Sequence, residues 1–219
     1  MSLKQLPTNT RLRWLAPIWA ALAIAALASL ATGRWTLAGV SALALVLCLA
    51  PIALATRYRI VLPLPFAIST TAFIIASLIF GEVLDAYEVV WWWDIALHGS
   101  SAIALGLIGF LFIYMLFHGD NFAAPAWAMA VIAFAIAASV GGLWEIFEYL
   151  VDRFFGANMQ RSGLDDTMTD MMVNAFGAAV GSLVGFGYLK GQSAGFPGRL
   201  ITDFVRLNRH LFKRANRKD

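Results

Sequence analysis

Six long stretches of apolar residues run through this chain of 219 residues, and they constrain its fold more than any other feature. A helix needs about 20 mainly apolar residues to cross a bilayer, and its backbone polar groups must all be paired within the segment. Hydrophobic residues make up 60% of the chain and charged residues only 13%. A soluble domain has about 25% charged residues. The sequence therefore predicts an all-α, polytopic membrane protein with six transmembrane helices.

The predicted spans follow one another with short connections. They cover about residues 14–31, 35–56, 64–80, 91–117, 124–150 and 166–189. A turn of three residues, Thr-Gly-Arg, joins the first two spans and makes them antiparallel neighbours. Pro63 and Pro65 open the third span, where a missing backbone N–H costs least. We expect the first span to be an uncleaved anchor, and residues 1–190 to form one transmembrane domain.

Lysine and arginine residues are distributed unequally between the two sides of this arrangement. Thirteen of the sixteen fall in the N-terminal segment, the connection after the second span or the C-terminal tail. The other three are Arg34, Arg153 and Arg161. Since basic residues mark the cytoplasmic side, we expect both termini in the cytoplasm and the protein in a bacterial-type inner membrane. The basic residues thus follow a membrane topology, and no nucleic-acid partner is expected.

The tail, residues 191–219, has the pattern of a basic amphipathic helix. Its apolar face consists of Leu200, Ile201, Phe204, Val205, Leu211 and Phe212. Such a helix binds anionic lipid of the inner leaflet, although a solvated helix that only fixes the topology fits the pattern as well. His118 and His210 lie at this side, and we assign them no chemistry. Cys48 has no second cysteine to pair with and is interpreted as a small buried hydrophobe.

Carboxylates gather on the opposite, outer side. Ten of the thirteen fall in the outer connections or at the outer ends of the spans, against three basic residues. They are Glu82, Asp85, Glu88, Asp94, Glu145, Glu148, Asp152, Asp165, Asp166 and Asp170. An acidic face attracts cations. The exclusion of basic residues from the outer side explains the acidic residues in the outer loops, but it does not explain the acidic residues within the spans.

The last predicted span combines a polar stripe with small residues. At about 100° per residue, Asp166, Asp170 and Asn174 lie on one face of the helix. The glycines that continue this face are Gly177, Gly181 and Gly185. Small residues at this spacing let a second helix approach closely, so the polar stripe is expected to face the inside of the bundle.

Two further spans carry polar faces at the same depth. Glu145 and Glu148 lie one turn apart near the end of the fifth span, and Asp94, His98 and Ser101 share a face at the start of the fourth. Three tryptophans at positions 91–93 fit the outer aromatic belt of a membrane. Consecutive helices with short connections are usually neighbours, so these faces are expected to meet in the outer third of the membrane.

The same residues resemble a known family. The segments "GGLWEIFEYLVD" and "SGLDDTMTDMMVNAFGA" resemble the signature of YjdF-type inner-membrane proteins, an E-x-x-E pair followed by D-T-x-x-D-M. The matching residues are Glu145, Glu148, Asp166, Thr167, Asp170 and Met171, and Asp94-x-x-x-His98 is similar to the family's earlier D-x-x-x-H. Asp170-x-x-x-Asn174 also resembles the last helix of VanZ-like proteins. The resemblance covers about residues 91–185, and Gln160 departs from the spacing of the family's Gln-Gly-Asp. Neither family has a settled activity, so the resemblance supports the site without naming a reaction.

The first hypothesis is a metal site that serves an enzyme. One histidine and several carboxylates suit a divalent cation such as Zn²⁺, Mn²⁺, Fe²⁺ or Mg²⁺. The candidate ligands are Asp94, His98, Glu148 and Asp170, while Glu145 or Asp166 would be the general base or would hold the ligands in place. A metal-activated water would then hydrolyse a lipid-linked or interfacial substrate.

Two alternatives stay open at this point. A proton- or cation-coupled carrier also needs an acidic vestibule that leads to buried carboxylates, and it requires a polar path that continues past Asn174. A structural cluster would instead have protonated carboxyls that share hydrogen bonds with Ser101, Thr167 and Asn174. It predicts that every acid is hydrogen-bonded.

Overall fold

The computed structural model describes residues 10–117, 124–192 and 195–212, and all regular structure within these ranges is helical. Six helices are long and apolar enough to cross a membrane. They are Leu12–Ala31, Trp35–Arg57, Leu64–Val83, Trp93–Phe117, Ala126–Phe155 and Leu164–Leu189. The predicted all-α polytopic fold is confirmed. His118 and the basic residues at the end of the tail lie outside the described residues.

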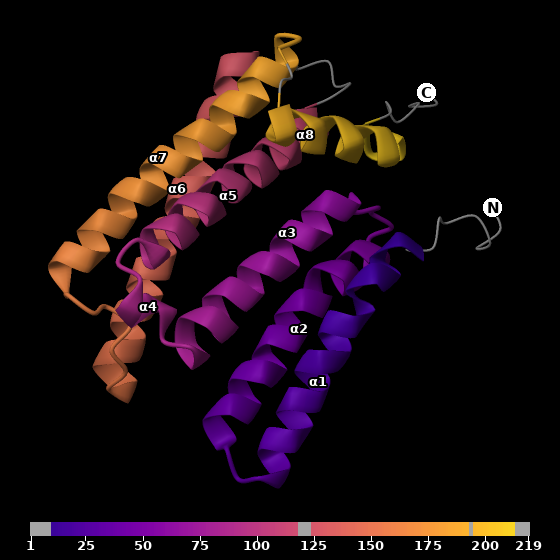
Figure 1. Ribbon diagram of the computed structural model, residues 1–219. Helices are drawn as coiled ribbons and strands as arrows, with labels where there is room; N and C mark the ends of the chain where they lie inside the picture. The colour runs from indigo at the N-terminus through magenta and orange to yellow at the C-terminus, as the bar shows by residue number, and fades with distance from the viewer. Residues whose placement is uncertain (1–9, 118–123, 193–194, 213–219) are drawn as a thin grey trace. The chain divides into compact units, whose positions relative to one another are not determined.

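The chain divides into two compact units, which meet in sequence at Trp91 and Trp92. The first unit contains a 3₁₀ turn (Thr10–Leu15), α1 (Ala16–Ala31), α2 (Trp35–Arg57) and α3 (Leu64–Ile74). Figure 1 shows α1 and α2 side by side, joined by a turn in which Gly33 has a φ of +71°. They are the antiparallel neighbours that the short connection predicts. Cys48 is buried between Leu22, Ala44 and Ile74, as expected of a small apolar side chain.

The third span differs from a regular helix. After Ile74 the chain continues as a π-helix (Ile75–Val83), which carries the span past the predicted end at residue 80. A short helix that the sequence did not indicate, α4 (Ala86–Val89), follows. The ring of Tyr87 lies against Gly81, and its hydroxyl forms a 3.0 Å hydrogen bond with the Ser77 hydroxyl. Only a glycine leaves room for this ring, which ties the short helix back to the span.

The second unit is a three-helix bundle with a fourth helix across one end. Its members are α5 (Trp93–Phe117), α6 (Ala126–Phe155), α7 (Leu164–Leu189) and α8 (Gly195–Leu207), followed by a 3₁₀ turn (Arg209–Phe212). Figure 1 shows α5, α6 and α7 packed along their lengths and α8 at the end of the bundle where α5 finishes.

The glycines of α7 let this helix touch α5, as predicted. A Cβ atom added at Gly177 would lie 2.8 Å from the Ala102 Cβ. One added at Gly106 would lie 2.9 Å from the Ala178 carbonyl oxygen. The two backbones are therefore nearly in contact, and the polar stripe that continues the glycine face points into the bundle.

The apolar face of α8 packs on protein. Ile201 is fully buried against Leu107, Phe110 and Ala133, and Val205 packs against the same cluster. The predicted amphipathic helix is present, but its apolar face covers the end of the bundle. Arg199 and Arg206 on its other face are exposed.

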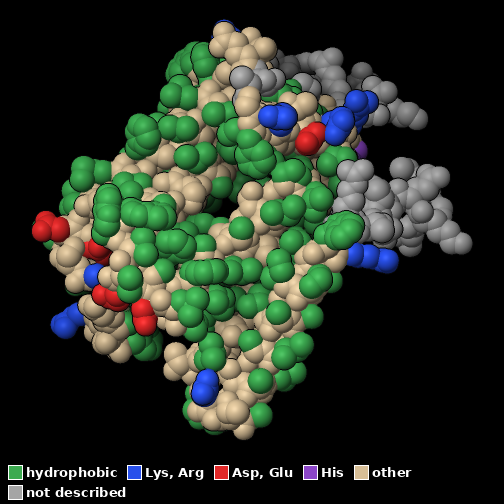
Figure 2. Space-filling view, in the orientation of Figure 1, with side chains coloured by type: hydrophobic (Ala, Val, Ile, Leu, Met, Phe, Trp, Pro, Cys, Tyr) green, Lys and Arg blue, Asp and Glu red, His purple; other side chains and the backbone are tan. Residues whose placement is uncertain are grey.

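The ends of α6 and α7 position the polar region. The sequence predicts the fifth span to end near residue 150, but α6 continues to Phe155 and stops at Gly156, which has a φ of +65°. The helix continues past Asp152 and Arg153 to Gly156, the first glycine after them, which adopts the left-handed conformation. Figure 2 shows acidic side chains gathered at this end of the second unit, while hydrophobic side chains cover its helices.

Candidate functional site

The polar region lies where α5 and α7 begin and α6 ends. Asp94 is in the first turn of α5 and Asp166 is in the first turn of α7. Carboxylates are stabilised at these positions because the helix dipole is positive at its N-terminus. Glu145 and Glu148 come from the last part of α6, one turn apart. Three helix ends therefore bring their acids to one depth of the bundle.

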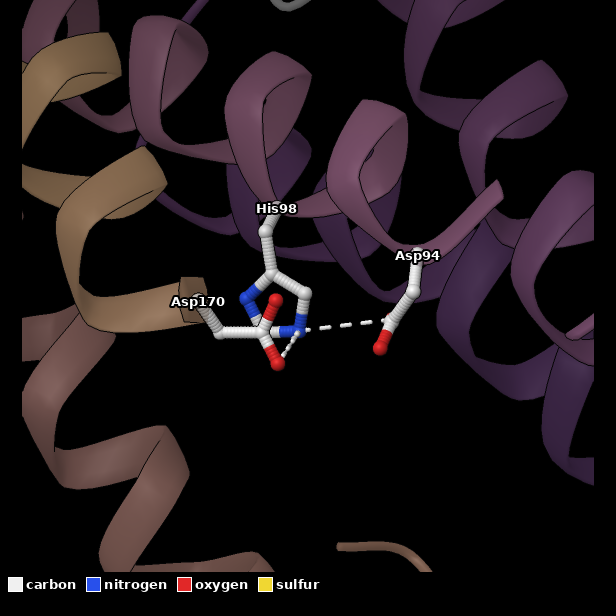
Figure 3. Close-up of side chains that lie close together, drawn as sticks. All are labelled: Asp94, His98 and Asp170. Carbon is white, nitrogen blue, oxygen red and sulfur yellow. Dashed lines mark ion pairs between the residues drawn. The ribbon is translucent and has the colours of Figure 1, made fainter. Parts of the chain in front are cut away.

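His98 stands at the centre of the site. Its Nε2 atom lies 3.5 Å from Asp94 Oδ1 and 3.8 Å from Asp170 Oδ2. Figure 3 shows the imidazole between these two carboxylates, which come from α5 and α7. Its other ring nitrogen, Nδ1, lies 3.7 Å from Glu145 Oε1, on α6. One imidazole thus faces carboxylates from all three helices of the bundle.

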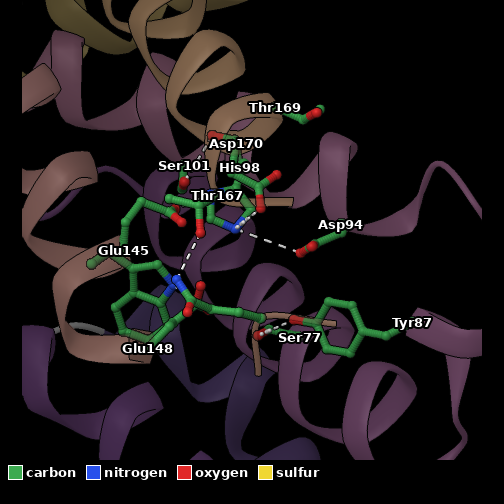
Figure 4. Close-up of polar contacts among 12 residues, drawn as sticks. Ser77, Tyr87, Asp94, His98, Ser101, Glu145, Glu148, Thr167, Thr169 and Asp170 are labelled. Atoms are coloured by element: carbon green, nitrogen blue, oxygen red, sulfur yellow. Dashed lines mark hydrogen bonds and ion pairs between the residues drawn. The ribbon is translucent and has the colours of Figure 1, made fainter. Parts of the chain in front are cut away.

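Glu148 is held by a neighbour on its own helix. Its Oε1 atom accepts a 2.8 Å hydrogen bond from Trp144 Nε1. Figure 4 shows Glu145 and Glu148 together with His98 and Asp170, with their side chains directed toward one another. Trp144 is not among the site residues predicted from the sequence. Its position four residues before Glu148 was the available signal, because side chains at this spacing share a helix face.

The central acids are buried and short of hydrogen-bond donors. Glu145 is 3% exposed and Asp170 is 2% exposed. Neither oxygen of Glu145 nor Oδ2 of Asp170 receives a hydrogen bond from any described residue. An uncompensated buried carboxylate is costly, so such a group is either protonated or compensated by a positively charged or hydrogen-bearing partner.

The distances in the site match those between ligands of one cation. Ligand bonds of about 2.1 Å place two ligand atoms roughly 3–4 Å apart on the same ion. The separations of 3.5–3.8 Å around His98 fall within this range and exceed an N–H···O hydrogen bond, which is about 2.7–3.2 Å. Two sets of three residues qualify as ligands, with ligand atoms within 4.8 Å of one another. One set is Asp94, His98 and Asp170, and the other is His98, Glu145 and Glu148.

The remaining predicted site residues lie around these two sets. The Ser101 hydroxyl donates to the His98 carbonyl oxygen at 2.9 Å, which holds the backbone of the central residue. Asp166 is half-buried at the start of α7 and belongs to neither set. Asn174 is buried one turn beyond Asp170, and its side chain lies against Gly141, where an added Cβ would be 3.0 Å away.

The loop between α6 and α7 is tied to both helices by polar contacts. Asp152 accepts hydrogen bonds from the backbone N–H groups of Met159 and Gln160, at 2.7 and 2.8 Å. The Gln160 side chain in turn donates to Thr167 Oγ1 at 2.6 Å. Asp152 and Thr167 therefore hold the loop beside the site. The shifted spacing of Gln160 in the sequence concealed this contact.

Tight packing lies directly beneath the site. Gly177 meets Ala102 and the Gly99 carbonyl oxygen, and Gly106 meets the backbone of α7 at Ala178. An apolar hollow between α6 and α7 is lined by Ala130, Val131, Phe134, Ala179, Ser182 and Leu183. It contains no ionisable side chain, so it does not extend the carboxylate cluster toward the other end of the bundle.

Comparisons with known proteins match most of the chain to one family. Residues 10–191 match the family described as "Predicted membrane protein (DUF2238)". An uncharacterised protein of Thermotoga maritima is 29% identical over 99 residues, which cover 45% of this chain and 50% of that protein. The chain thus spans about half the length of this curated relative, and no solved structure matches it. Because the family match extends over residues 10–191, most of the chain, the chain belongs to the DUF2238 family of predicted membrane proteins.

Proposed function

We propose that this integral membrane protein binds a divalent cation, such as Zn²⁺, Mn²⁺, Fe²⁺ or Mg²⁺, at the outer ends of α5, α6 and α7. The observation that carries the proposal is the set of separations around His98. His98 Nε2 lies 3.5 Å from Asp94 Oδ1 and 3.8 Å from Asp170 Oδ2, which is too long for hydrogen bonds and matches the separation of ligand atoms on one ion. The buried, unpaired oxygens of Glu145 and Asp170 support it, since a cation would compensate their charge.

The bound cation would serve chemistry on a lipid-linked or interfacial substrate. A divalent cation lowers the pKa of a bound water and so supplies a nucleophile at neutral pH. Asp166 is half-buried beside the ligand sets and is a candidate general base for that water. Glu145 is the other candidate base, although its deep burial favours a role in holding His98.

The two alternative functions require features that differ from those described. A structural cluster needs every acid to be hydrogen-bonded, whereas three oxygens of Glu145 and Asp170 lack a donor among the described residues. A carrier needs a polar path past Asn174, whereas beneath it α5 and α7 are in near-backbone contact at Gly177 and Gly106. Both observations favour cation binding over these alternatives.

The proposal also includes the orientation of the protein in the membrane and its relation to known families. The distribution of basic residues supports a bacterial-type inner membrane with both termini in the cytoplasm, a membrane domain over residues 1–190 and a cytoplasmic tail after it. The exposed Arg199 of α8 supports contact with anionic inner-leaflet lipid, whereas the exposed Arg206 is paired with Asp203 at 2.7 Å. The D-x-x-x-H, E-x-x-E and D-x-x-x-N patterns support kinship with YjdF-type proteins and, more distantly, VanZ-like proteins.

Metal content measured by mass spectrometry tests the proposal. Protein purified without chelators is expected to carry a divalent metal, and His98→Ala is expected to lose it, because both candidate sets contain His98. Asp165→Asn is the matched control, since Asp165 is an exposed carboxylate on the same helix as Asp170 and lies outside both sets. A wild-type protein that stays free of metal after reconstitution, or a His98→Ala variant that retains it, would contradict cation binding here.

A further inference from the structure

The two candidate ligand sets cannot share one cation through His98. The lone pairs of the two ring nitrogens point away from each other, so one ion bonds to one nitrogen only. Nε2 faces Asp94 and Asp170, whereas Nδ1 faces Glu145. The site therefore divides into an Nε2 side and an Nδ1 side. The residues around each nitrogen decide which of the two suits a cation.

The Nε2 side has the features of an open cation site. Its two carboxylates come from different helices, and together they balance the two positive charges of a divalent ion. The side chain of Asp94 is 26% exposed, against 10% for His98 and 4% for Asp170, so Asp94 is the ligand of this set most accessible to solvent. A catalytic cation keeps at least one coordination position for water, and the three protein ligands of this side would leave one such position on a four-coordinate ion.

The Nδ1 side has the features of a buried hydrogen-bond acceptor. Glu145 is 3% exposed, and both of its oxygens lack a donor among the described residues. Glu148 Oε1 already accepts the Trp144 N–H. When Nε2 binds an ion, a neutral imidazole carries its proton on Nδ1, and metal-bound histidines almost always donate this proton to a carboxylate or carbonyl. Nδ1 lies 3.7 Å from Glu145 Oε1, so a shift of roughly 0.5–1 Å would bring this proton within hydrogen-bond distance and supply the missing donor.

We further propose, on the basis of the function proposed above, that Asp94, His98 Nε2 and Asp170 bind the cation and that Glu145 accepts the Nδ1 proton. Glu145 is then a positioning residue: it fixes the tautomer and the orientation of the imidazole without touching the ion. Glu148 lies outside the ligand shell. The protein binds one cation per chain at this site.

Zinc affinity of the purified full chain separates the two sides. Zn²⁺ binding is measured by competition with a chromophoric chelator for wild type, Asp170→Asn, Glu145→Gln and Glu148→Gln, with Asp165→Asn as the control. Asp170→Asn is expected to lose stoichiometric binding, and Glu145→Gln to keep one Zn²⁺ per chain with about 10-fold weaker affinity, since a neutral acceptor orients the ring less firmly. Glu148→Gln is expected to keep one Zn²⁺ per chain.

A spectroscopic readout separates positioning from a general structural effect. In the Cu²⁺-loaded protein, pulsed electron paramagnetic resonance detects the ring nitrogen that is not bonded to the ion, and its quadrupole coupling depends on its hydrogen bond. Wild type is expected to show this remote nitrogen, and Glu145→Gln is expected to change its coupling. A variant that merely loosens the fold would leave the coupling as in wild type.

Several outcomes would overturn the division of roles. They are loss of Zn²⁺ in Glu145→Gln or Glu148→Gln, two Zn²⁺ ions per chain, no remote nitrogen, or a coupling in Glu145→Gln equal to that of wild type. In each of these, wild type still binds Zn²⁺ and the proposed function stands. A wild-type protein that binds neither Zn²⁺ nor any other divalent metal would remove both proposals.

Discussion

Asp152 shows how one carboxylate of an acidic cluster can have a purely local task. It lies on the same face of α6 as Glu145 and Glu148, yet its oxygens accept hydrogen bonds from the backbone N–H groups of Met159 and Gln160. These contacts hold the loop that leads into α7, and thereby the position of Asp170 relative to α6. Sequence spacing alone groups Asp152 with Glu145 and Glu148, because a helix face does not reveal which acid turns toward a loop.

Removing the Asp152 carboxylate should loosen this loop. Hydrogen bonds to a charged group contribute about 1.5–3 kcal/mol each. Asp152→Ala is therefore expected to speed hydrogen exchange at the amides of Met159 and Gln160, as followed by mass spectrometry of peptides that cover residues 156–163. The exposed Asn158, changed to Ala, is the control in the same loop. Equal exchange in the two variants would mean that Asp152 does not anchor the loop.

At the scale of helices, the contact between α5 and α7 decides how the site is assembled. Gly106 faces the Ala178 carbonyl oxygen and the Gly181 Cα atom, where an added Cβ would lie 2.9 and 3.0 Å away. Both neighbours are backbone atoms, which cannot rotate aside. This contact sets the distance between the two helices that carry His98 and Asp170.

Gly106→Ala should therefore destabilise the bundle. Overpacking costs about 1–3 kcal/mol, which exceeds the roughly 1 kcal/mol that alanine gains over glycine in a helix. Gly142→Ala on α6 meets nothing within 4 Å and is the matched control, expected to be neutral or slightly stabilising. Unfolding in mixed micelles with increasing dodecyl sulfate would compare the two. Similar midpoints for both variants would show that α5 and α7 can separate without cost.

At the scale of the whole molecule, the orientation in the membrane determines which compartment would supply the proposed cation. Basic residues concentrate on one side of the spans and acids on the other. The single cysteine, Cys48, is 2% exposed, so the chain offers a convenient background for introduced cysteines.

Cysteine labelling in intact cells tests this orientation. In a Cys48→Ser background, Ser162→Cys in the α6–α7 loop should react with a membrane-impermeant maleimide from outside. Gln192→Cys, after α7, should react only once the cells are permeabilised. Both native residues are exposed, so access is decided by the membrane. The reverse pattern would place the acidic end in the cytoplasm and would contradict the predicted topology.

Much of the fold could be predicted because its causes are local. Span length and apolar content predict the six helices, and the spacing of Gly177 and Gly181 predicts a close helix contact on the face of Asp170. The predicted ends fail where apolar content is not the cause. The π-helix after Ile74 has no signal in hydropathy, and α6 continues past the charged pair Asp152 and Arg153 to Gly156.

The sequence by itself determined the class of protein, the helices and the faces on which the acids lie, because hydrophobicity and helical periodicity act within a segment. Only the tertiary structure decided that Nε2 of His98 faces Asp94 and Asp170 while Nδ1 faces Glu145. It also decided that the apolar face of α8 packs on the bundle. Except for the pair of Asp94 and His98 within α5, these contacts join residues from different helices. They depend on the rotation and separation of neighbouring helices, which close packing sets and no single segment encodes.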